Sequence, residues 1–410
     1  MRSTGREDSM SMYAYIGNDP DIRLWNLTSH TRYHRILAKM GIQNFVNTIQ
    51  ELPSDNSVLL IRGDFLYDER VFSYLLKHIN VVLEVPTAVG LRPVAAYVDP
   101  SLASSTWDGI QQECTRGIAG LQSVTLKDLS ISFSNELRKS DHPYVFPIHE
   151  DNRVVLEEQL FTGSYKGVTD LVTKFLWPVP AKWATRFCAR WGISPNQVTS
   201  LSLILVIAVG ILFGYGLFFW GLVLGWVMTF LDTVDGKLAR VTVTSSKWGN
   251  IFDHGIDLIH PPLWYLAWGI GLPAFSPLIS WLTLEITLGI ILCGYILGRM
   301  IEGIFQWWLA GFVIFCWKPL DSYFRLITAR RNPNLILLTG SFLLGRPDLG
   351  LEAVALWTVG STVILLIRLL MAVWEKGTVG SLTSWLAAID PVNRHSLAVR
   401  MFTNPPAVLK

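Results

Sequence analysis

Long uncharged stretches alternate with short charged connections along the second half of the chain. The longest runs from Val198 to Leu231, and another extends from Leu258 to Leu284. A bilayer core about 30 Å thick takes roughly 20 apolar residues in a helix, so the first stretch is long enough to cross it and turn back. The pattern predicts six membrane-spanning helices, near 198–217, 219–239, 248–271, 278–301, 332–346 and 352–374.

A further apolar segment, Gly303 to Trp317, leaves a seven-helix alternative open. The connections near 214–221 and 271–280 carry no Lys or Arg, whereas the opposite connections and the C-terminal tail carry several cations. Because positively charged loops stay on the cytoplasmic side, this alternation places both termini in the cytoplasm. Six helices keep that arrangement, and seven would break it.

Short apolar runs bounded by turn residues characterise the first 150 residues. Val58–Ile61, Val81–Val85 and Ala95–Val98 are typical of buried strands, and helical periodicity appears in Thr31–Ala38 and Asp68–Lys77. Strands that alternate with helices predict a small, mostly parallel sheet. The expected fold is therefore an all-α polytopic membrane bundle preceded by a small cytoplasmic α/β domain.

The chain is expected to contain four segments: an α/β domain over 1–150, a linker over 151–197, a membrane domain over 198–376 and a cytoplasmic tail over 377–410. Tryptophans interleave with Lys and Arg between Lys166 and Arg190 of the linker, which predicts an amphipathic helix at the level of the lipid headgroups. The tail is expected to form a surface helix followed by a disordered end.

The composition also indicates a membrane protein. Half of the 410 residues are hydrophobic, the mean hydropathy is +0.36 and only 16% are charged, against about a quarter in soluble domains. The net charge of +2 gives no sign of a nucleic-acid partner, and none is expected. The four cysteines lack CxxC spacing, so reduced thiols are expected rather than a disulfide framework or a zinc site. The polar residues from Met1 to Met12 predict no cleavable signal peptide.

Four carboxylates stand at the ends of the predicted spans, where an unpaired acid costs roughly 3 kcal/mol. Helical spacing places Asp232, Asp235, Gly236 and Ala239 on one face of a helix, and Gly249, Asp253 and Asp257 on one face of the next. The small residues among them let the two helices approach closely, which would bring the carboxylates together. Such an oxygen cluster suits Mg²⁺ or Mn²⁺, and a metal pair can clamp both ends of a displacement at phosphorus.

This pattern resembles the signature of the CDP-alcohol phosphotransferase family, integral membrane enzymes of phospholipid and phosphodiester synthesis. Eight positions match at the family's spacing: Asp232, Asp235, Gly236, Ala239, Arg240, Gly249, Asp253 and Asp257. The resemblance extends over residues 165–375 and implies a homodimer in the membrane, the inner membrane if the source is bacterial. It also implies the reaction, in which an acceptor hydroxyl attacks the β-phosphorus of a CDP-alcohol and CMP leaves.

Roles for individual residues follow from the resemblance. Asp232, Asp235 and Asp253 would hold two divalent ions, and Asp257 would share that site or remove the acceptor's proton as the catalytic base. The residues expected at the CDP moiety are Asn196, Thr199, Asp232, Gly236, Ala239, Arg240 and Gly249. The donor and acceptor are either CDP-diacylglycerol with a polar acceptor, or a polar donor such as CDP-inositol with a sugar or inositol phosphate.

A second set of polar residues is predicted at the same depth as the aspartates. Arg299 and Glu302 fall at the cytoplasmic end of the fourth predicted span, and Arg330 and Arg331 at the start of the fifth. Because Arg suits bidentate phosphate contact, these residues are candidates for binding the acceptor's phosphate or headgroup. Topology anchoring by the two consecutive arginines, with an ion pair between Arg299 and Glu302, is the alternative.

The first 150 residues carry a fainter resemblance. Gly63–Asp68 resembles the metal-binding strand end of sugar-phosphate nucleotidyltransferases, but Tyr13–Trp25 lacks their glycine-rich, basic nucleotide loop. A degenerate domain of that type is expected, with Asp64 as a turn residue, and it favours a polyol phosphate as acceptor. A transporter that uses the intramembrane acids for cations, or a non-catalytic scaffold, remains the alternative function.

Overall fold

The computed structural model describes residues 12–87, 90–129, 132–245, 247–274, 283–389 and 395–404, without the side chains of 132, 247, 248, 250–254 and 274. It divides into two compact units. The α/β unit comprises the described residues up to 129 together with His142–Thr162. The helical unit comprises Ser132–Asp141 and the described residues of Gly163–Pro405. The unit boundary therefore differs from the predicted one at 150, because a hairpin at 132–141 packs within the helical unit.

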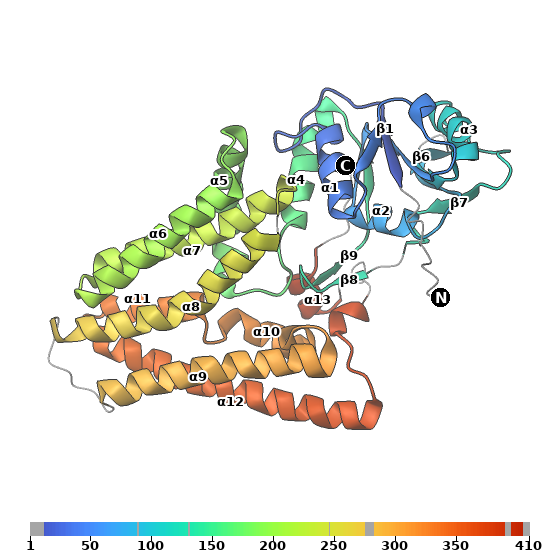
Figure 1. Cartoon of the computed structure of the whole chain (residues 1–410). Helices are drawn as coiled ribbons and strands as arrows, with labels where there is room; N and C mark the ends of the chain where they lie inside the picture. Colours follow the sequence, from blue (N-terminus) through green and yellow to red (C-terminus); the bar gives the residue numbers. More distant parts are fainter. Residues whose placement is uncertain are drawn as a thin grey trace, which may run out of the picture. The chain divides into compact units, whose positions relative to one another are not determined.

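A six-stranded sheet forms the centre of the α/β unit, in the order β2-β1-β3-β6-β5-β7 (Figure 1). Its strands are β1 (Tyr13–Gly17), β2 (Asn44–Val46), β3 (Val58–Arg62), β5 (Val81–Thr87), β6 (Gly90–Val98) and β7 (Gln122–Thr125). Among these six, β6 alone runs antiparallel to its neighbours. The remaining elements include β4 (Phe65–Tyr67), β10 (Val145–Pro147), α1 (Ser29–Lys39), α2 (Glu69–Leu75), α3 (Pro100–Gln111) and α4 (Arg153–Gly163). The predicted strands, helices and mostly parallel sheet of this region are confirmed.

The turn after β3 shows how Asp64 is held. The Arg62 guanidinium binds both carboxylate oxygens of Asp64, at 2.9 and 2.6 Å. The Gly63 amide donates to the Gly17 carbonyl at the end of β1, and a Cβ on Gly63 would lie 2.9 Å from the Asp19 backbone. This arrangement describes a turn packed against its neighbouring strand end, with the aspartate neutralised by an arginine. The likeness to nucleotidyltransferases stays a prediction.

Helices make up most of the second unit. They are α5 (Pro178–Arg190), α6 (Pro195–Gly214), α7 (Phe218–Val241), α8 (Lys247–Gly271), α9 (Leu284–Ile304), α10 (Pro319–Ile327), α11 (Arg331–Leu343) and α12 (Pro347–Val379). A tight turn with Gly216 at φ +74° joins α6 to α7, so the two helices run side by side in opposite directions (Figure 1). In the same way α9 lies along α12. Each of the six predicted spans corresponds to one of these helices.

Four of the described helices are long and apolar enough to cross a membrane: α6, α7, α12 and α9 with its continuation to Ala310. This indicates an integral membrane protein. The predicted span at 332–346 is shorter than expected, since the 13 residues of α11 extend only about 20 Å. The segment Gly303–Trp317 is not a separate helix, because Gly311 at φ +75° ends the continuation of α9 and a short buried turn follows.

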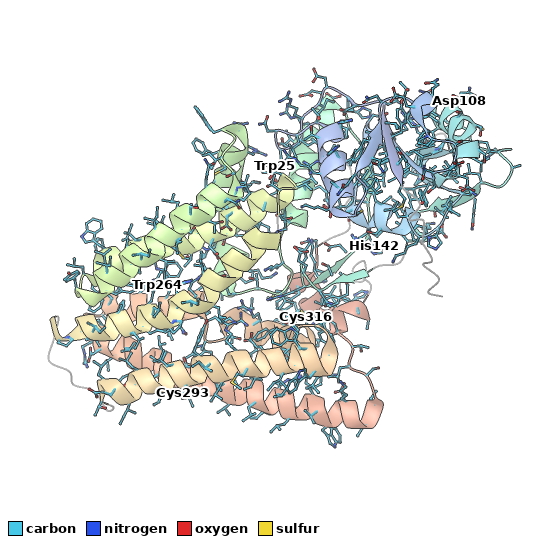
Figure 2. All side chains as sticks on the ribbon, viewed as in Figure 1. Trp25, Asp108, His142, Trp264, Cys293 and Cys316 are labelled. Atoms are coloured by element: carbon cyan, nitrogen blue, oxygen red, sulfur yellow. The ribbon has the colours of Figure 1, made fainter. Side chains whose placement is uncertain are left out.

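Two aromatic-rich cores hold the helical unit together. In the first, Trp268 of α8 packs against Phe213 and Phe218 at the α6–α7 turn, with ring centroids 4.8 and 4.2 Å apart. Figure 2 shows Trp264 on the same helix. The second core surrounds Phe305 and Phe315, and the buried Cys316, labelled in Figure 2, belongs to it. All four cysteines lie in the described part of the chain and are free thiols; Cys293 on α9 is exposed (Figure 2).

The C-terminal tail contributes to the second core, contrary to the prediction of a surface helix. Leu386 and Phe402 are almost completely buried, with 0% and 1% of their surfaces exposed. The hairpin of β8 (Ser132–Ser134) and β9 (Lys139–Asp141) joins the same region, where the Ser140 hydroxyl donates to the Leu386 carbonyl. Apolar side chains of the tail are thus covered by the hairpin and the ends of the helices, and α13 (Leu397–Phe402) is part of this packing.

The linker helix has the surface expected of a membrane-interface helix. On α5, Trp183 and Phe187 are 67% and 55% exposed, and Trp191 follows at 74%. Lys182, Arg186 and Arg190 lie on the same helix. Exposed aromatic rings beside cations match the environment between headgroups and acyl chains.

Candidate active site

Two of the predicted metal ligands come together on one cation. The guanidinium of Arg331 donates through Nη2 to Asp232 of α7 and, at 2.6 Å, through Nη1 to Asp257 of α8. The side chains of Arg331 and Asp232 are only 15% and 16% exposed, whereas that of Asp257 is 42% exposed. Carboxylates from adjacent helices therefore converge as the periodicity predicts, with Asp257 the more open of the pair.

Asp235 binds a different residue, Thr199 of α6. Its carboxylate accepts a hydrogen bond of 2.8 Å from the Thr199 hydroxyl of α6, and the side chain is buried. Pro195 and a capping box between Ser194 and Gln197 start this helix. Asn196 is exposed at the same helix start. The first turn of α6 thus brings Thr199, a predicted nucleotide contact, directly onto the aspartate motif.

The side chain of Asp253 lies outside the described residues, so its place in the cluster stays a prediction. Among the described side chains no group of three or more His, Cys, Asp or Glu gathers at one point. Asp232 and Asp257 nevertheless direct oxygens at one shared cation, the Arg331 guanidinium. Hard oxygen donors from two helices that already hold a positive charge fit a divalent ion such as Mg²⁺.

The rest of the motif on α7 contacts a loop that the sequence did not single out. Arg240 Nε donates to the Ser164 carbonyl at 2.9 Å, and Lys237 lies 3.5 Å from the centre of the Tyr165 ring. The space beside Gly236 is filled by Arg240, whose Nη2 lies 3.0 Å from where a Cβ would be. Gly236 therefore makes room for the motif's own arginine rather than for a neighbouring helix. Ala239 and Gly249 are half-buried.

Three consecutive residues at the start of α11 each bind acids from other elements. Arg330 binds Glu302 of α9, Arg331 binds Asp232 and Asp257, and Asn332 donates to Asp170 at 2.9 Å. Burial alone would raise the pKa of Asp170, but the Arg325 charge and hydrogen bonds from Thr173 and Asn332 hold it below its usual range. The start of α11 is therefore a polar junction at one end of the helices, not a simple topology anchor.

A small cavity adjoins this junction between α9, α12 and the segment 328–330. Arg299, Glu302 and Arg330 line it together with hydroxyl groups, which belong to Thr328, Thr358, Ser361 and Thr362. Arg299 also pairs with Glu302 at 3.4 Å, as the alternative interpretation of these residues expected. Charged and hydroxyl groups around one cavity can bind a polar, anionic molecule.

Arg325 is a residue that the sequence analysis missed. It lies on α10, is 8% exposed and contacts the Phe315 ring. Its Nε and Nη1 have no hydrogen-bond partner in the described part of the chain, and burial lowers its pKa to about 10. Such a guanidinium has donors available for an anion. No periodic pattern marks Arg325, and only its burial in the tertiary structure distinguishes it from a surface cation.

Comparisons with known proteins find similar sequences over the segment that carries this site. Residues 192–329 match the model of the CDP-alcohol phosphatidyltransferase family, which confirms the resemblance for this segment. The chain is 36% identical over 91 residues to a phosphatidylinositol phosphate synthase of Streptomyces avermitilis, a match that covers 20% of this chain and 37% of that protein.

Two eukaryotic relatives match a similar region. A cholinephosphotransferase 1 of Xenopus laevis is 31% identical over 134 residues, 30% of this chain and 32% of the relative. That of Danio rerio is 30% identical over 115 residues, 25% of this chain and 29% of the relative. The chain thus spans about a third of the length of the curated relatives that it matches.

Proposed function

We propose that this chain is a metal-dependent CDP-alcohol phosphotransferase, which transfers a substituted phosphate from a CDP-alcohol to the hydroxyl of a second alcohol. One observation carries the proposal: carboxylates of α7 and α8, both inside the segment 192–329 that matches the family, converge on a single cation, Arg331. The family resemblance and the carboxylate donors both support divalent metal binding. The predicted topology puts this site at the cytoplasmic side of the membrane.

Bound divalent ions, Mg²⁺ or Mn²⁺, would neutralise the diphosphate of the donor. Asp232, Asp235 and Asp253 are proposed as their ligands, Asp257 shares that site, and the Thr199 hydroxyl orients Asp235. Asp257 accepts the proton of the acceptor hydroxyl, and its open position suits a group that must touch a substrate. The acceptor oxygen then bonds to the β-phosphorus, the bond from that phosphorus to the bridging oxygen breaks, and CMP leaves with the electron pair.

The polar cavity beside the junction is proposed as the acceptor site. Arg299 and Arg330 would bind an anionic group, and the hydroxyls of Thr328 and Ser361 a polyol. Arg325 has free donors nearby and is proposed as a third phosphate contact. A phosphorylated polyol fits this lining better than a neutral lipid alcohol does, and the relative named a phosphatidylinositol phosphate synthase supports that choice.

Product analysis tests the proposed reaction directly. The purified full chain in lipid nanodiscs would be given Mg²⁺ with pairs drawn from CDP-diacylglycerol, CDP-inositol and CDP-choline as donors, and inositol phosphate, glycerol phosphate and diacylglycerol as acceptors. We expect CMP release that requires both substrates and the metal, with the joined product identified by mass spectrometry. Absence of CMP release for every pair in a folded preparation would contradict the proposal.

Replacing Arg299 by Gln should raise the KM for a phosphorylated acceptor about tenfold and leave the KM for the CDP donor unchanged, because the lost contact is a charge-assisted bond to phosphate. Initial rates at varied concentrations of each substrate measure this split. Arg346→Gln is the matched control, since this arginine pairs with Asp348 at the start of α12, outside the cavity. An unchanged acceptor KM in Arg299→Gln would show that the residue only pairs with Glu302.

The arrangement of charges also weighs against a transporter. A cation pathway needs acids distributed through the membrane's depth. Here the contacts of Arg330, Arg331 and Asn332 gather Glu302, the aspartate pair and Asp170 around the start of one helix. Charges gathered at one end of the helices suit a site that receives substrates from the aqueous side.

A further inference from the structure

Arg331 binds carboxylate oxygens for which a bound metal ion would compete. Its two terminal nitrogens bind one oxygen from each of two proposed metal ligands, Asp232 and Asp257, and these bonds hold α7, α8 and α11 together. The carboxylate oxygens that accept hydrogen bonds from the guanidinium are also the atoms that would coordinate a divalent ion. A carboxylate oxygen engaged by Arg331 is therefore less available to a metal.

The charges strengthen this competition. Without a cation between them, the two partly buried carboxylates would repel each other, so a positive group is required whenever metal is absent. When a divalent ion binds, the guanidinium and the ion carry like charges and would lie within a few ångströms of each other. Like charges at such separations in a partly desolvated site are strongly unfavourable.

We propose that Arg331 is the counter-ion of the metal-free site and that divalent metal binding displaces it from Asp232 and Asp257. Arg330, the preceding residue, lines the proposed acceptor cavity, so a phosphate bound there would be a new partner for the displaced guanidinium. Arg331 is thus a positioning residue that keeps the metal ligands in register and sets the affinity for the ion. This inference depends on the proposed metal site and not on the identity of either substrate.

Direct measurement of Mn²⁺ binding tests the proposal without any turnover. The full chain in nanodiscs would be titrated with Mn²⁺, and free ion followed by electron paramagnetic resonance. We expect Arg331→Gln to bind Mn²⁺ about tenfold more tightly than wild type, because the ion no longer competes with the guanidinium for Asp232 and Asp257 and no longer meets its like charge. Metal-free Arg331→Gln should also unfold at a lower temperature, and Mn²⁺ should raise its midpoint more than that of wild type.

Arg330→Gln is the matched control, because it removes the same charge one residue away where the partner is Glu302. Its effect on the Mn²⁺ affinity measures the general loss of positive potential, and the proposal requires a clearly larger effect in Arg331→Gln. Equal effects, or an Arg331→Gln affinity that is unchanged or weaker, overturn the inference. If Arg331→Gln does not fold, Arg331→Lys replaces it: the flexible ammonium keeps the charge but lacks the rigid pair of terminal nitrogens that binds one oxygen of each carboxylate, so Mn²⁺ should still bind more tightly than in wild type.

The result separates this inference from the proposed function. Tight Mn²⁺ binding by wild type with no change in Arg331→Gln removes the counter-ion role and leaves the proposed reaction intact. If Arg331→Gln binds Mn²⁺ more tightly as expected but no substrate pair gives CMP release, the counter-ion role stands and the proposed reaction is wrong. Wild type that binds no Mn²⁺ at all would overturn both the metal site and this inference.

Discussion

Asp257→Asn is expected to lower kcat for CMP release about a thousandfold, within the range that loss of a catalytic base produces. The amide cannot accept the acceptor's proton, and it also loses the charge that pairs with Arg331 at 2.6 Å. Because Asp257 is the more exposed carboxylate of the pair, the substitution does not bury a new unpaired group. CMP release under saturating donor and acceptor, with the metal present, is the measurement.

The control for this experiment is Glu285→Gln, which removes an exposed carboxyl from the first turn of α9. It changes the net charge of the protein by the same amount and should leave kcat unchanged. Unimpaired CMP release in a folded Asp257→Asn protein would contradict the proposed role and would favour the non-catalytic scaffold. Thermal unfolding of both variants distinguishes a chemical effect from a loss of structure.

Gly271→Ala is expected to cause the largest loss of stability among single substitutions in the helical unit that add one methyl group. A Cβ at this position would lie 1.9 Å from the Phe213 carbonyl oxygen and 2.8 Å from the Gly216 amide nitrogen. Both are backbone atoms of the tight α6–α7 turn, so no side-chain rotation relieves the clash. Overpacking of this kind costs about 3 kcal/mol, and the midpoint of thermal unfolding in detergent should fall by several degrees.

Gly289→Ala on α9 is the corresponding control, because nothing lies within 4 Å of its added Cβ. An alanine in place of glycine within a helix is otherwise favourable by about 1 kcal/mol. The control should therefore unfold at the wild-type temperature or slightly above it. If Gly271→Ala matches the control, the close approach between the end of α8 and the α6–α7 turn is wrong.

Part of the candidate site was predictable from spacing. Helical periodicity places Asp232 on the face of α7 that meets α8, and Asp257 three turns into the next helix, so their convergence follows from local geometry. The position of the acids, Arg299 and Arg330 near helix ends was predictable as well, because they stand where uncharged runs end. Thr199 was identified through the resemblance to the family and not from its spacing.

Which residues bind the charged side chains of the candidate site was not predictable from the sequence. The sequence pattern makes Arg331 a candidate for binding the acceptor, whereas in the structure Arg331 binds Asp232 of α7 and Asp257 of α8. Arg325 and Asp170 show no periodic signal, and their roles depend on burial by elements distant in the chain. The burial of the C-terminal tail was unpredictable for the same reason, because its few apolar residues pack against the hairpin at 132–141, which is distant in the chain.

Local rules thus determine which residues of this protein lie on helices, how far apart along a helix they stand, and that long uncharged helices end in acids. These properties follow from the period of the helix and the cost of charge in lipid, which act within one segment at a time. The tertiary structure alone decides which arginine neutralises which aspartate and which glycine touches backbone. Those pairings join residues far apart in the chain, such as Arg331 and Asp232, which stand 99 positions apart, and they depend on packing that no single segment contains.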